Sequence, residues 1–559
     1  MRYDAEFILK WNDRLLSTRR LFEWAWRDIN DYILVNKTGI DELSAGQKKT
    51  TKLFDSTATR ALKRLAATMH GSLTSSSMTW FKLRMRDEPL NRIKRVRLWL
   101  EDTGDIMLQE LNHSNFASEV QEIYTDLIGP ATAAMFSEER EMTTPGKFPG
   151  IRFQAIPVGT FVIDEGPDGI VDCLFRTIKL TPHSIVRRFV GTTLPDKILD
   201  EAKQRKDTLH EIVHAICPRE IGKTNGLPDT RYLPYSSTYV LRNPRAILRD
   251  SGFHEFPCQV PRWDKLSGET YGRGPSHEIL PDVKTLNKAV ELSLKAFGKA
   301  IDPPLKAKND GIVGGEVRLQ AGGITYVTDM ESLVPMELGS KWDVIKFKVE
   351  DLRQAIKEAY LADHIQLKES PAMTAEEVRT RHEQMIRLLG PTLGRLESEF
   401  LNPLIQRVFN MMYRGGAIPM PPEEVFSAMA NNRGDIDIEY VGPLSRGQRI
   451  NEVYAMERMV AFIQPVSAVN PGVLDNYDFD EMARISAQIL GAPESVIRDE
   501  KDVEDIRKDR AEAEAEDKEI SRGSVDAKTA KDLKDATPET ANQESEEAQV
   551  LRLIQGGRA

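Results

Sequence analysis

The longest helical pattern in the chain, residues 374–413, constrains the fold more than any other feature. Thr374 and Glu377 have the spacing of a capping box at its start. Apolar side chains then recur at helical spacing, at Val378, Met385, Leu388, Leu389, Leu396, Phe400, Leu404 and Val408. At about 1.5 Å per residue, such a helix is roughly 60 Å long, which is more than a compact core requires. The pattern therefore predicts a scaffold, a helical bundle or an assembly.

Two prolines interrupt this pattern. Gly390 and Pro391 lie near its middle, and Pro403 follows one segment later. Proline has no N–H, so Pro391 cannot donate to the carbonyl of Arg387, and the helix must kink or break there. We therefore predict a long, kinked helix over 374–413.

The segments before this helix predict two more amphipathic helices on either side of an insertion. Residues 276–299 place Ile279, Val283, Leu286, Val290, Leu294 and Phe297 on one face. Lys284, Lys288, Lys295 and Lys299 share another face, centred roughly 150° away. Glycine-containing, strand-like pieces over 305–345 predict a small β-rich insertion. A second helix is expected over 343–365, and the short loop 366–373 then leads into the long helix.

The rest of the chain indicates a mainly helical α+β protein. Helical patterns occur at 1–35 (expected as a helix pair), 51–83 (where 80–83 begins a strand), 105–138, 181–206, 446–464, 478–490 and 502–520. Alternating, strand-like patterns occur at 150–180, 209–217, near 239, at 253–260 and at 436–441. With 559 residues, the chain is long enough for three or four domains.

Charge and cysteine content exclude several classes of protein. The net charge is −10, and residues 500–559 carry 17 acidic and 11 basic residues, so the tail contributes −6 and the body only −4. General coating of nucleic acid needs many more cations. The three cysteines are far apart in sequence and predict buried thiols in a reducing compartment. Residues 1–6 include acids where a signal peptide would be apolar, so we expect no export by this route. No apolar run is long enough to span a membrane, so we expect no membrane partner.

The sequence contains only weak candidates for a catalytic, metal-binding or nucleic-acid-binding motif. His210–His214 reads HEIVH, which on a helix would place two zinc ligands one turn apart with Glu211 as general base. However, Ile212 and Val213 favour a strand, on which positions four apart are about 13 Å apart. Residues 82–97 hold a basic cluster that indicates either a nucleic-acid patch or, more simply, a solvated or subunit-facing helix surface. We expect no enzyme activity, no cofactor and no metal.

The order of these elements resembles the portal, or head–tail connector, proteins of tailed bacteriophages, in particular the short-tailed (podovirus) type. The segments that carry the resemblance are 53–58 (LFDSTA), 80–83 (WFKL), 271–275 (YGRGP), 302–304 (DPP), 373–379 (MTAEEVR), 389–391 (LGP) and 401–404 (LNPL). The resemblance covers roughly residues 1–490. It rests on the order of the segments, because none of them is a chemical motif.

The resemblance implies a ring of subunits, usually twelve, at one capsid vertex, through which double-stranded DNA enters during packaging and leaves at ejection. It also implies partners: a separate terminase ATPase, tail adaptor proteins, and scaffolding and major capsid proteins. The protein would be made in the host cytoplasm and become part of the virion. Twelve helices about 10 Å apart form a circle roughly 38 Å across, which leaves about 28 Å for a duplex.

The resemblance also implies a division of the chain. The implied regions are an N-terminal wing (1–270), a first stem helix (271–300), a clip (301–342), a second stem helix (343–365), a tunnel loop (366–373), a kinked wing helix with a strand (374–445), a crown (446–499) and a charged, largely disordered tail (500–559). Gln366, Lys368 and Glu369 would then lie in the tunnel loop, with Lys368 as the strongest candidate for DNA contact.

Alternatives remain open at this point. From the sequence alone, the four lysines of 276–299 are more simply explained as a solvated face than as a channel lining. A zinc metalloprotease that uses residues 210–214 is the second interpretation of the function. An oligomeric virion scaffold without a DNA channel is the third.

Overall fold

The N-terminal segment forms one long helix, α1 (Ala5–Tyr32). The Asp4 carboxylate accepts a hydrogen bond from the Ala5 N–H at 2.8 Å and so caps the helix. The computed structural model describes residues 4–35, 52–140, 148–219, 232–301, 305–307, 333–335, 342–362, 388–430, 435–441, 443–490, 492, 496–498 and 502–515. The predicted pair of helices over 1–35 is wrong, because residues 5–35 contain no glycine or proline that would favour a turn.

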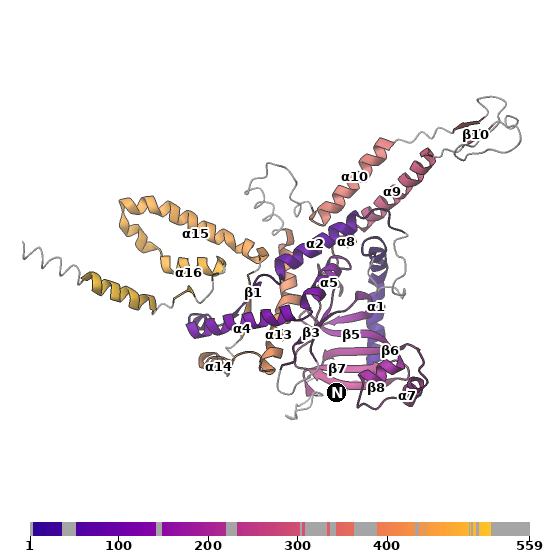
Figure 1. Cartoon of the computed structure of the whole chain (residues 1–559), viewed down its shortest axis with the longest axis horizontal. Coiled ribbons are helices and arrows are strands. Elements are labelled where there is room, and N and C mark those ends of the chain that lie inside the picture. Colours follow the sequence, from indigo (N-terminus) through magenta and orange to yellow (C-terminus); the bar gives the residue numbers. More distant parts are fainter. Residues whose placement is uncertain are drawn as a thin grey trace, which may run out of the picture.

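The alternating segments of the first half form an antiparallel sheet of five strands in chain order, β4-β5-β6-β7-β8. The strands are β4 (Phe161–Glu165), β5 (Val171–Leu180), β6 (His210–Pro218), β7 (Tyr235–Leu241) and β8 (Ala246–Phe253). Two short helices, α6 (Pro182–Arg188) and α7 (Asp196–Lys203), connect β5 to β6. Helix α1 lies against this sheet (Figure 1) and buries Ile8 and Leu9 with Val213 and Val240 of its strands.

Two smaller sheets join segments that are far apart in the sequence. One has the order β3-β2-β9, with β2 (Met135–Glu139), β3 (Ile151–Ala155) and β9 (Cys258–Gln259). The other pairs β1 (Phe81–Met85) with β12 (Ile436–Tyr440), Phe81 lying opposite Tyr440. The helix expected over 105–138 is therefore wrong at its end: Gly129 and Pro130 end the helix, and residues 135–139 form a strand.

The largest core cluster lies among helices. Its members come mainly from α2 (Thr57–Leu73), α4 (Lys94–His113), α5 (Phe116–Ile128), α9 (Leu280–Ile301), α10 (Trp342–Ala359) and α13 (Asn402–Arg414). Tyr124 and Phe400 are fully buried in it and make an edge-to-face contact, with 6.4 Å between ring centroids. Short helices α3 (Glu88–Asn91) and α8 (Pro275–Glu278) and the 3-10 turn Val158–Thr160 complete this part of the chain.

Helices α9 and α10 pack against each other and project from the body, and the strands β10 (Leu305–Ala307) and β11 (Leu333–Pro335) pair antiparallel at their far end (Figure 1). The predicted order of helix, β-rich insertion and helix is thus present in the described residues. The second helix is shorter than the predicted 343–365, because Leu361 takes a left-handed conformation (φ 55°) just after it.

The described part of the long helix begins at Leu388 and is helical through Leu396, on both sides of Pro391. A π-helical turn, Glu397–Leu401, follows and leads directly into α13. The irregularity among the described residues thus lies immediately before Pro403, whose missing N–H explains why regular α-helical bonding does not continue there. The helix does not break at Pro391, and the kink predicted at Gly390–Pro391 stays a prediction.

The C-terminal part is helical, and the helices predicted at 446–464, 478–490 and 502–520 are present in its described residues. Its elements are α14 (Glu423–Ala430), α15 (Pro443–Val469), the 3-10 turn Pro471–Asn476 and α16 (Phe479–Leu490), and residues 502–515 are also helical. Arg507 in that last helix makes two hydrogen bonds with Asp480 of α16, at 2.7 and 2.8 Å. Among the helices in the described ranges, none combines the length and apolar character needed to cross a bilayer.

Candidate functional site

The base of the projecting α9–α10 pair is held by a buried polar junction around Asp55. Asn287 of α9 accepts hydrogen bonds from the backbone N–H groups of Phe54 and Asp55, at 2.8 and 3.0 Å. Arg353 of α10 donates from Nε and Nη2 to Asp55 Oδ2, at 3.0 and 2.8 Å. The other oxygen of Asp55 accepts from the N–H of Thr57 at the start of α2, at 2.8 Å. Asp55 therefore connects the N-terminus of α2 to both projecting helices, to α10 through its carboxylate and to α9 through its backbone N–H.

The charge of Asp55 is stabilised by these partners. Burial alone would raise the pKa of its carboxyl group, but the hydrogen bonds from Thr57 and the guanidinium of Arg353 outweigh burial and lower this pKa below its usual value. The carboxylate is therefore ionised at neutral pH, and it remains paired with Arg353.

The lysine face of α9 is largely neutralised within the chain. Lys284 pairs with Asp28 of α1 at 2.5 Å. Lys288 and Lys295 both pair with Glu291, at 3.0 and 2.6 Å. Lys299 is exposed and makes no ion pair with another described residue. The sequence correctly placed these four lysines on a common face away from the apolar stripe, but it did not reveal the carboxylates beside three of them.

The apolar stripe of α9 changes its environment along the helix. Ile279, Val283 and Leu286 are buried in the core at the base. Farther out, Leu294, Phe297 and Ile301 continue the same stripe but are exposed by 56%, 57% and 69%. Large apolar side chains in line on a helix that projects from the body are typical of a surface that another protein covers.

The segment that the resemblance assigns to the tunnel loop, with Gln366, Lys368 and Glu369, lies outside the described residues. Gly390 and Pro391 are described, and they lie in the helical segment 388–396 that precedes the π-helical turn. Nothing in the described contacts assigns either of these two residues a ligand.

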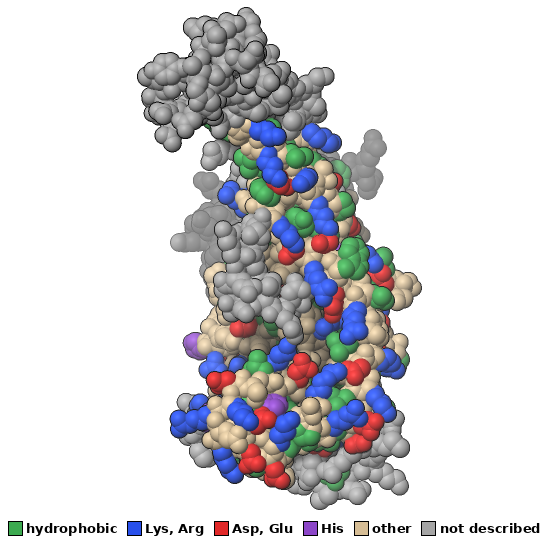
Figure 2. Space-filling model, turned by 90° about the vertical axis from the view of Figure 1, so that its right-hand side faces the viewer, with side chains coloured by type: hydrophobic (Ala, Val, Ile, Leu, Met, Phe, Trp, Pro, Cys, Tyr) green, Lys and Arg blue, Asp and Glu red, His purple; other side chains and the backbone are tan. Residues whose placement is uncertain are grey.

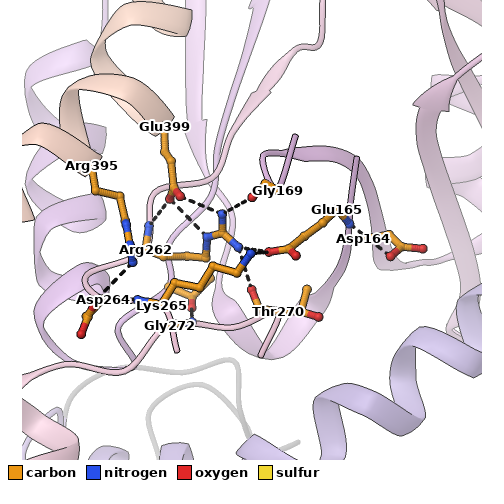
Figure 3. A network of polar contacts seen from close by, with 11 residues as sticks. Asp164, Glu165, Gly169, Arg262, Asp264, Lys265, Thr270, Gly272, Arg395 and Glu399 are labelled. Carbon is orange, nitrogen blue, oxygen red and sulfur yellow. Dashed lines mark hydrogen bonds and ion pairs between the residues drawn. The ribbon is translucent and has the colours of Figure 1, made fainter. Parts of the chain in front are cut away.

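The π-helical turn is held by a buried arginine that the sequence did not single out (Figure 3). The side chain of Arg262 is fully buried. Its backbone N–H and its Nε both donate to Glu399 Oε2, at 3.0 and 3.2 Å, and its Nη2 donates to Glu399 Oε1 at 2.7 Å. Arg262 thereby fixes Glu399, a residue of the π-helical turn, from the segment that connects β9 to α8.

The same guanidinium reaches the turn between β4 and β5. It pairs with Glu165 and donates to the carbonyl oxygens of Gly169 and Thr270, at 2.9 and 3.1 Å. Burial would lower the pKa of Arg262, but the carboxylates of Glu399 and Glu165 raise it overall. Arg262 therefore joins the five-stranded sheet to the long helix as a permanently charged link.

A glycine next to this network shows how closely the chain is packed. A Cβ added at Gly272 would lie 2.3 Å from the carbonyl oxygen of Ala131. Gly272 belongs to the sequence 271–275 (YGRGP) that carried the resemblance, and close backbone approach explains why a glycine is required there. Residues 271–275 were the one segment beside the Arg262 network that the sequence analysis had singled out.

The HEIVH segment is a strand, as predicted. His210 and His214 lie on β6, and His210 Nε2 is 2.6 Å from Glu201. His214 Nδ1 accepts a hydrogen bond from Arg176 Nε at 2.9 Å, so its Nε2 carries the proton and donates to Ser237 Oγ at 2.9 Å. Burial, together with the positive charge of Arg176, lowers the pKa of His214 well below its usual value. Both ring nitrogens of this neutral histidine are occupied, so it is not placed to bind zinc.

The basic cluster of 82–97 is partly neutralised in the same way. Arg84 pairs with Glu88 at 2.8 Å, and Arg86 pairs with Asp435 at 2.8 Å. Basic and acidic side chains are likewise interspersed on another face of the molecule, the right-hand side of Figure 1 that is shown in Figure 2. These pairs favour a solvated helix surface over a nucleic-acid patch.

Comparison with known proteins identifies the family. Residues 6–497 match the model of the bacteriophage head to tail connecting protein family. The chain belongs to this family. Two curated relatives agree with the assignment. The first, a probable portal protein of Bordetella phage BPP-1, is 28% identical in an alignment of 529 residues that covers 90% of each chain. The second, a portal protein of Salmonella phage epsilon15, is 28% identical in an alignment of 546 residues that covers 95% of each chain.

A solved structure also matches this connector. It is described as the neck of an empty GTA particle computed with C6 symmetry, with 10% sequence identity and a TM-score of 0.35. The match covers 72% of the present chain and 86% of the neck chain.

Proposed function

We propose that the protein is a portal that assembles into a ring of twelve subunits at one capsid vertex and conducts double-stranded DNA into and out of the head. The observation that carries this proposal is the family match over residues 6–497, which includes the projecting α9–α10 pair. Two relatives that align with nearly the whole chain are named portal proteins. In this proposal α9 and α10 are the stem, residues 301–342 the clip and residues 366–373 the tunnel loop.

The exposed apolar stripe supports lateral contact between stems. Leu294, Phe297 and Ile301 lie on a helix that extends beyond the body, so a neighbouring copy is the partner that covers them in a closed ring. Burying one such side chain contributes about 1.5–3 kcal/mol, and a ring repeats the contact at every subunit.

Negative-stain microscopy of the purified chain tests this assembly. A ring with a central hole is the expected result, and a solid particle would contradict the channel. Phe297→Ser should reduce the fraction of rings, whereas Val190→Ser, at a side chain that is 82% exposed far from the stem, should not. Equal ring fractions in the two variants would exclude the stripe as the subunit contact.

We further propose that the clip docks terminase during packaging and tail adaptor proteins afterwards, and that scaffolding and major capsid proteins surround the ring in the virion after synthesis in the host cytoplasm. No enzyme activity is needed for this role, because terminase supplies the energy. The geometry of His210 and His214 gives no support to a metalloprotease.

Lys368 is our candidate for contact with DNA in the tunnel loop. Lys368→Glu should impair packaging or retention of DNA while rings still assemble, because it replaces attraction for phosphate with repulsion. Lys299→Glu, on the exposed lysine face of α9, shows whether any reversal of charge in the stem has the same effect. Normal DNA filling of Lys368→Glu particles would refute this role.

A further inference from the structure

Two cysteines lie on neighbouring strands at the centre of the five-stranded sheet. Leu174 of β5 is opposite Ile216 of β6 in the antiparallel register, so Cys173 comes opposite Cys217 one position farther along. Directly opposed residues of antiparallel strands have Cα atoms about 4.5–5.5 Å apart, and a disulfide spans about 4.4–6.8 Å. The backbone positions are therefore compatible with a bond between the two sulfur atoms.

Both thiols face the same core, beneath the N-terminal half of α1. Cys173 and Cys217 are 2% and 1% exposed and belong to one cluster with Ala5, Ile8 and Leu9 of that helix. A hydrogen bond between the two thiols is the main cause that lowers the pKa of Cys217, whereas burial raises the pKa of Cys173 well above its usual value. The Cys217 Sγ also lies 3.1 Å from Ser236 Oγ on β7. Hydrogen bonds to Cys173 and Ser236 therefore favour the thiolate at Cys217.

We propose that Cys173 and Cys217 form a built-in oxidation site that hydrogen peroxide converts into a disulfide between β5 and β6. The Cys217 thiolate attacks the peroxide oxygen, the O–O bond breaks, and one water leaves after protonation, which yields a sulfenic acid. The Cys173 sulfur then attacks the Cys217 sulfur, and the sulfenic oxygen leaves as a second water. Two thiols are oxidised, one hydrogen peroxide is reduced, and two waters are formed.

Cys258 provides an internal control for this reaction. It is also 2% exposed, and burial raises its pKa to about 12. It lies on β9, in a different sheet and a different core cluster from the pair. It therefore experiences the same oxidant without a thiol opposite it in the register.

The experiment treats the purified full-length chain with hydrogen peroxide, then denatures it in excess alkylating reagent and maps the peptides by mass spectrometry. We expect Cys173 and Cys217 to lose alkylation together and to appear in one cross-linked peptide pair that dithiothreitol separates, while Cys258 stays alkylated. Cys258→Ser should keep the cross-link, and Cys173→Ser and Cys217→Ser should each abolish it.

Three results would overturn the proposal. Cys173 and Cys217 could stay alkylated as fully as in untreated protein, they could become sulfinic acids without a cross-link, or they could cross-link to Cys258 as readily as to each other. The wild-type chain alone distinguishes these outcomes, so the test does not depend on the folding of any variant. The proposal is also independent of the proposed portal function.

Discussion

Replacing Arg262 with leucine tests whether the buried guanidinium holds the π-helical turn to the sheet. The substitution removes the side-chain hydrogen bonds to Glu399, Gly169 and Thr270 and keeps only the one from the backbone N–H to Glu399. It leaves the Glu399 carboxylate, whose side chain is only 9% exposed, without its cation. Glu165 is less affected, because Lys265 remains 2.7 Å away. Breaking a buried ion pair by removing one partner costs about 3–5 kcal/mol.

Hydrogen–deuterium exchange measures this cost locally, which matters because a chain of this length need not unfold in one step. Since about 1.36 kcal/mol corresponds to a factor of ten, amides of Glu397–Leu401 should exchange roughly 150- to 5,000-fold faster in Arg262→Leu. Amides of the β4–β5 turn should lose protection with them, because the same side chain holds both segments.

Two further variants show whether the effect of Arg262→Leu comes from the buried ion pair. Arg395→Leu removes a neighbouring arginine whose pair with Asp264 is 3.3 Å long and largely exposed, so its cost should be below about 1 kcal/mol and its effect on exchange at most about fivefold. The double variant Arg262→Leu with Glu399→Leu removes both buried charges and should regain much of the lost protection. If Arg262→Leu exchanges like Arg395→Leu, the buried pair does not hold the turn.

Two further predictions concern the base of the α9–α10 pair and the long helix. Asp55→Asn should lower the melting temperature at neutral pH. Because the pKa of Asp55 is held below its usual 3.8, the stabilisation it provides is complete above that value and lost as pH falls through the lower, folded-state pKa, so the variant should also lose this acid-dependent step. Asp351→Asn, at an exposed pair with Lys348, is the matched control, and equal acid profiles for the two variants would argue against the junction. Replacing Gly390 and Pro391 with two alanines should straighten the helix and disturb ring assembly or packaging, as seen by microscopy and by DNA content, and normal packaging would show that the two residues are only tolerated.

Much of the fold could be predicted, because its elements have strong local patterns. The strand at 210–218 was predicted correctly against a competing motif, since β-branched residues at Ile212 and Val213 favour extended backbone. The helix–insertion–helix unit was equally clear from the apolar stripe of α9 and the glycines that follow it. The single helix α1 was wrongly predicted as a helix pair, although no glycine or proline interrupts residues 5–35.

The polar links could not be predicted, because each depends on residues that are distant in sequence. Arg262 and Glu399 are 137 positions apart, and Asp55 and Arg353 are 298 apart. Asn287 and Arg353 lie close to the apolar stripes of their helices, and a polar residue in such a position is the one local sign that a buried partner exists. That sign gives no indication of which residue the partner is.

The ion pairs of α9 bear on how a portal could conduct DNA. A conduit has to pass a duplex without holding it, and each lysine–phosphate contact adds affinity that must be lost again when the DNA moves. Lys288 and Lys295 share one carboxylate, Glu291, and Lys284 is paired with Asp28, so three lysines are offset by two acids. A phosphate that approaches these lysines therefore competes with a carboxylate already in place, which weakens each contact and favours sliding over binding. The exposed Lys299 is the exception on this face among the described residues. If the stem retards DNA at any of the four lysines, it should do so there.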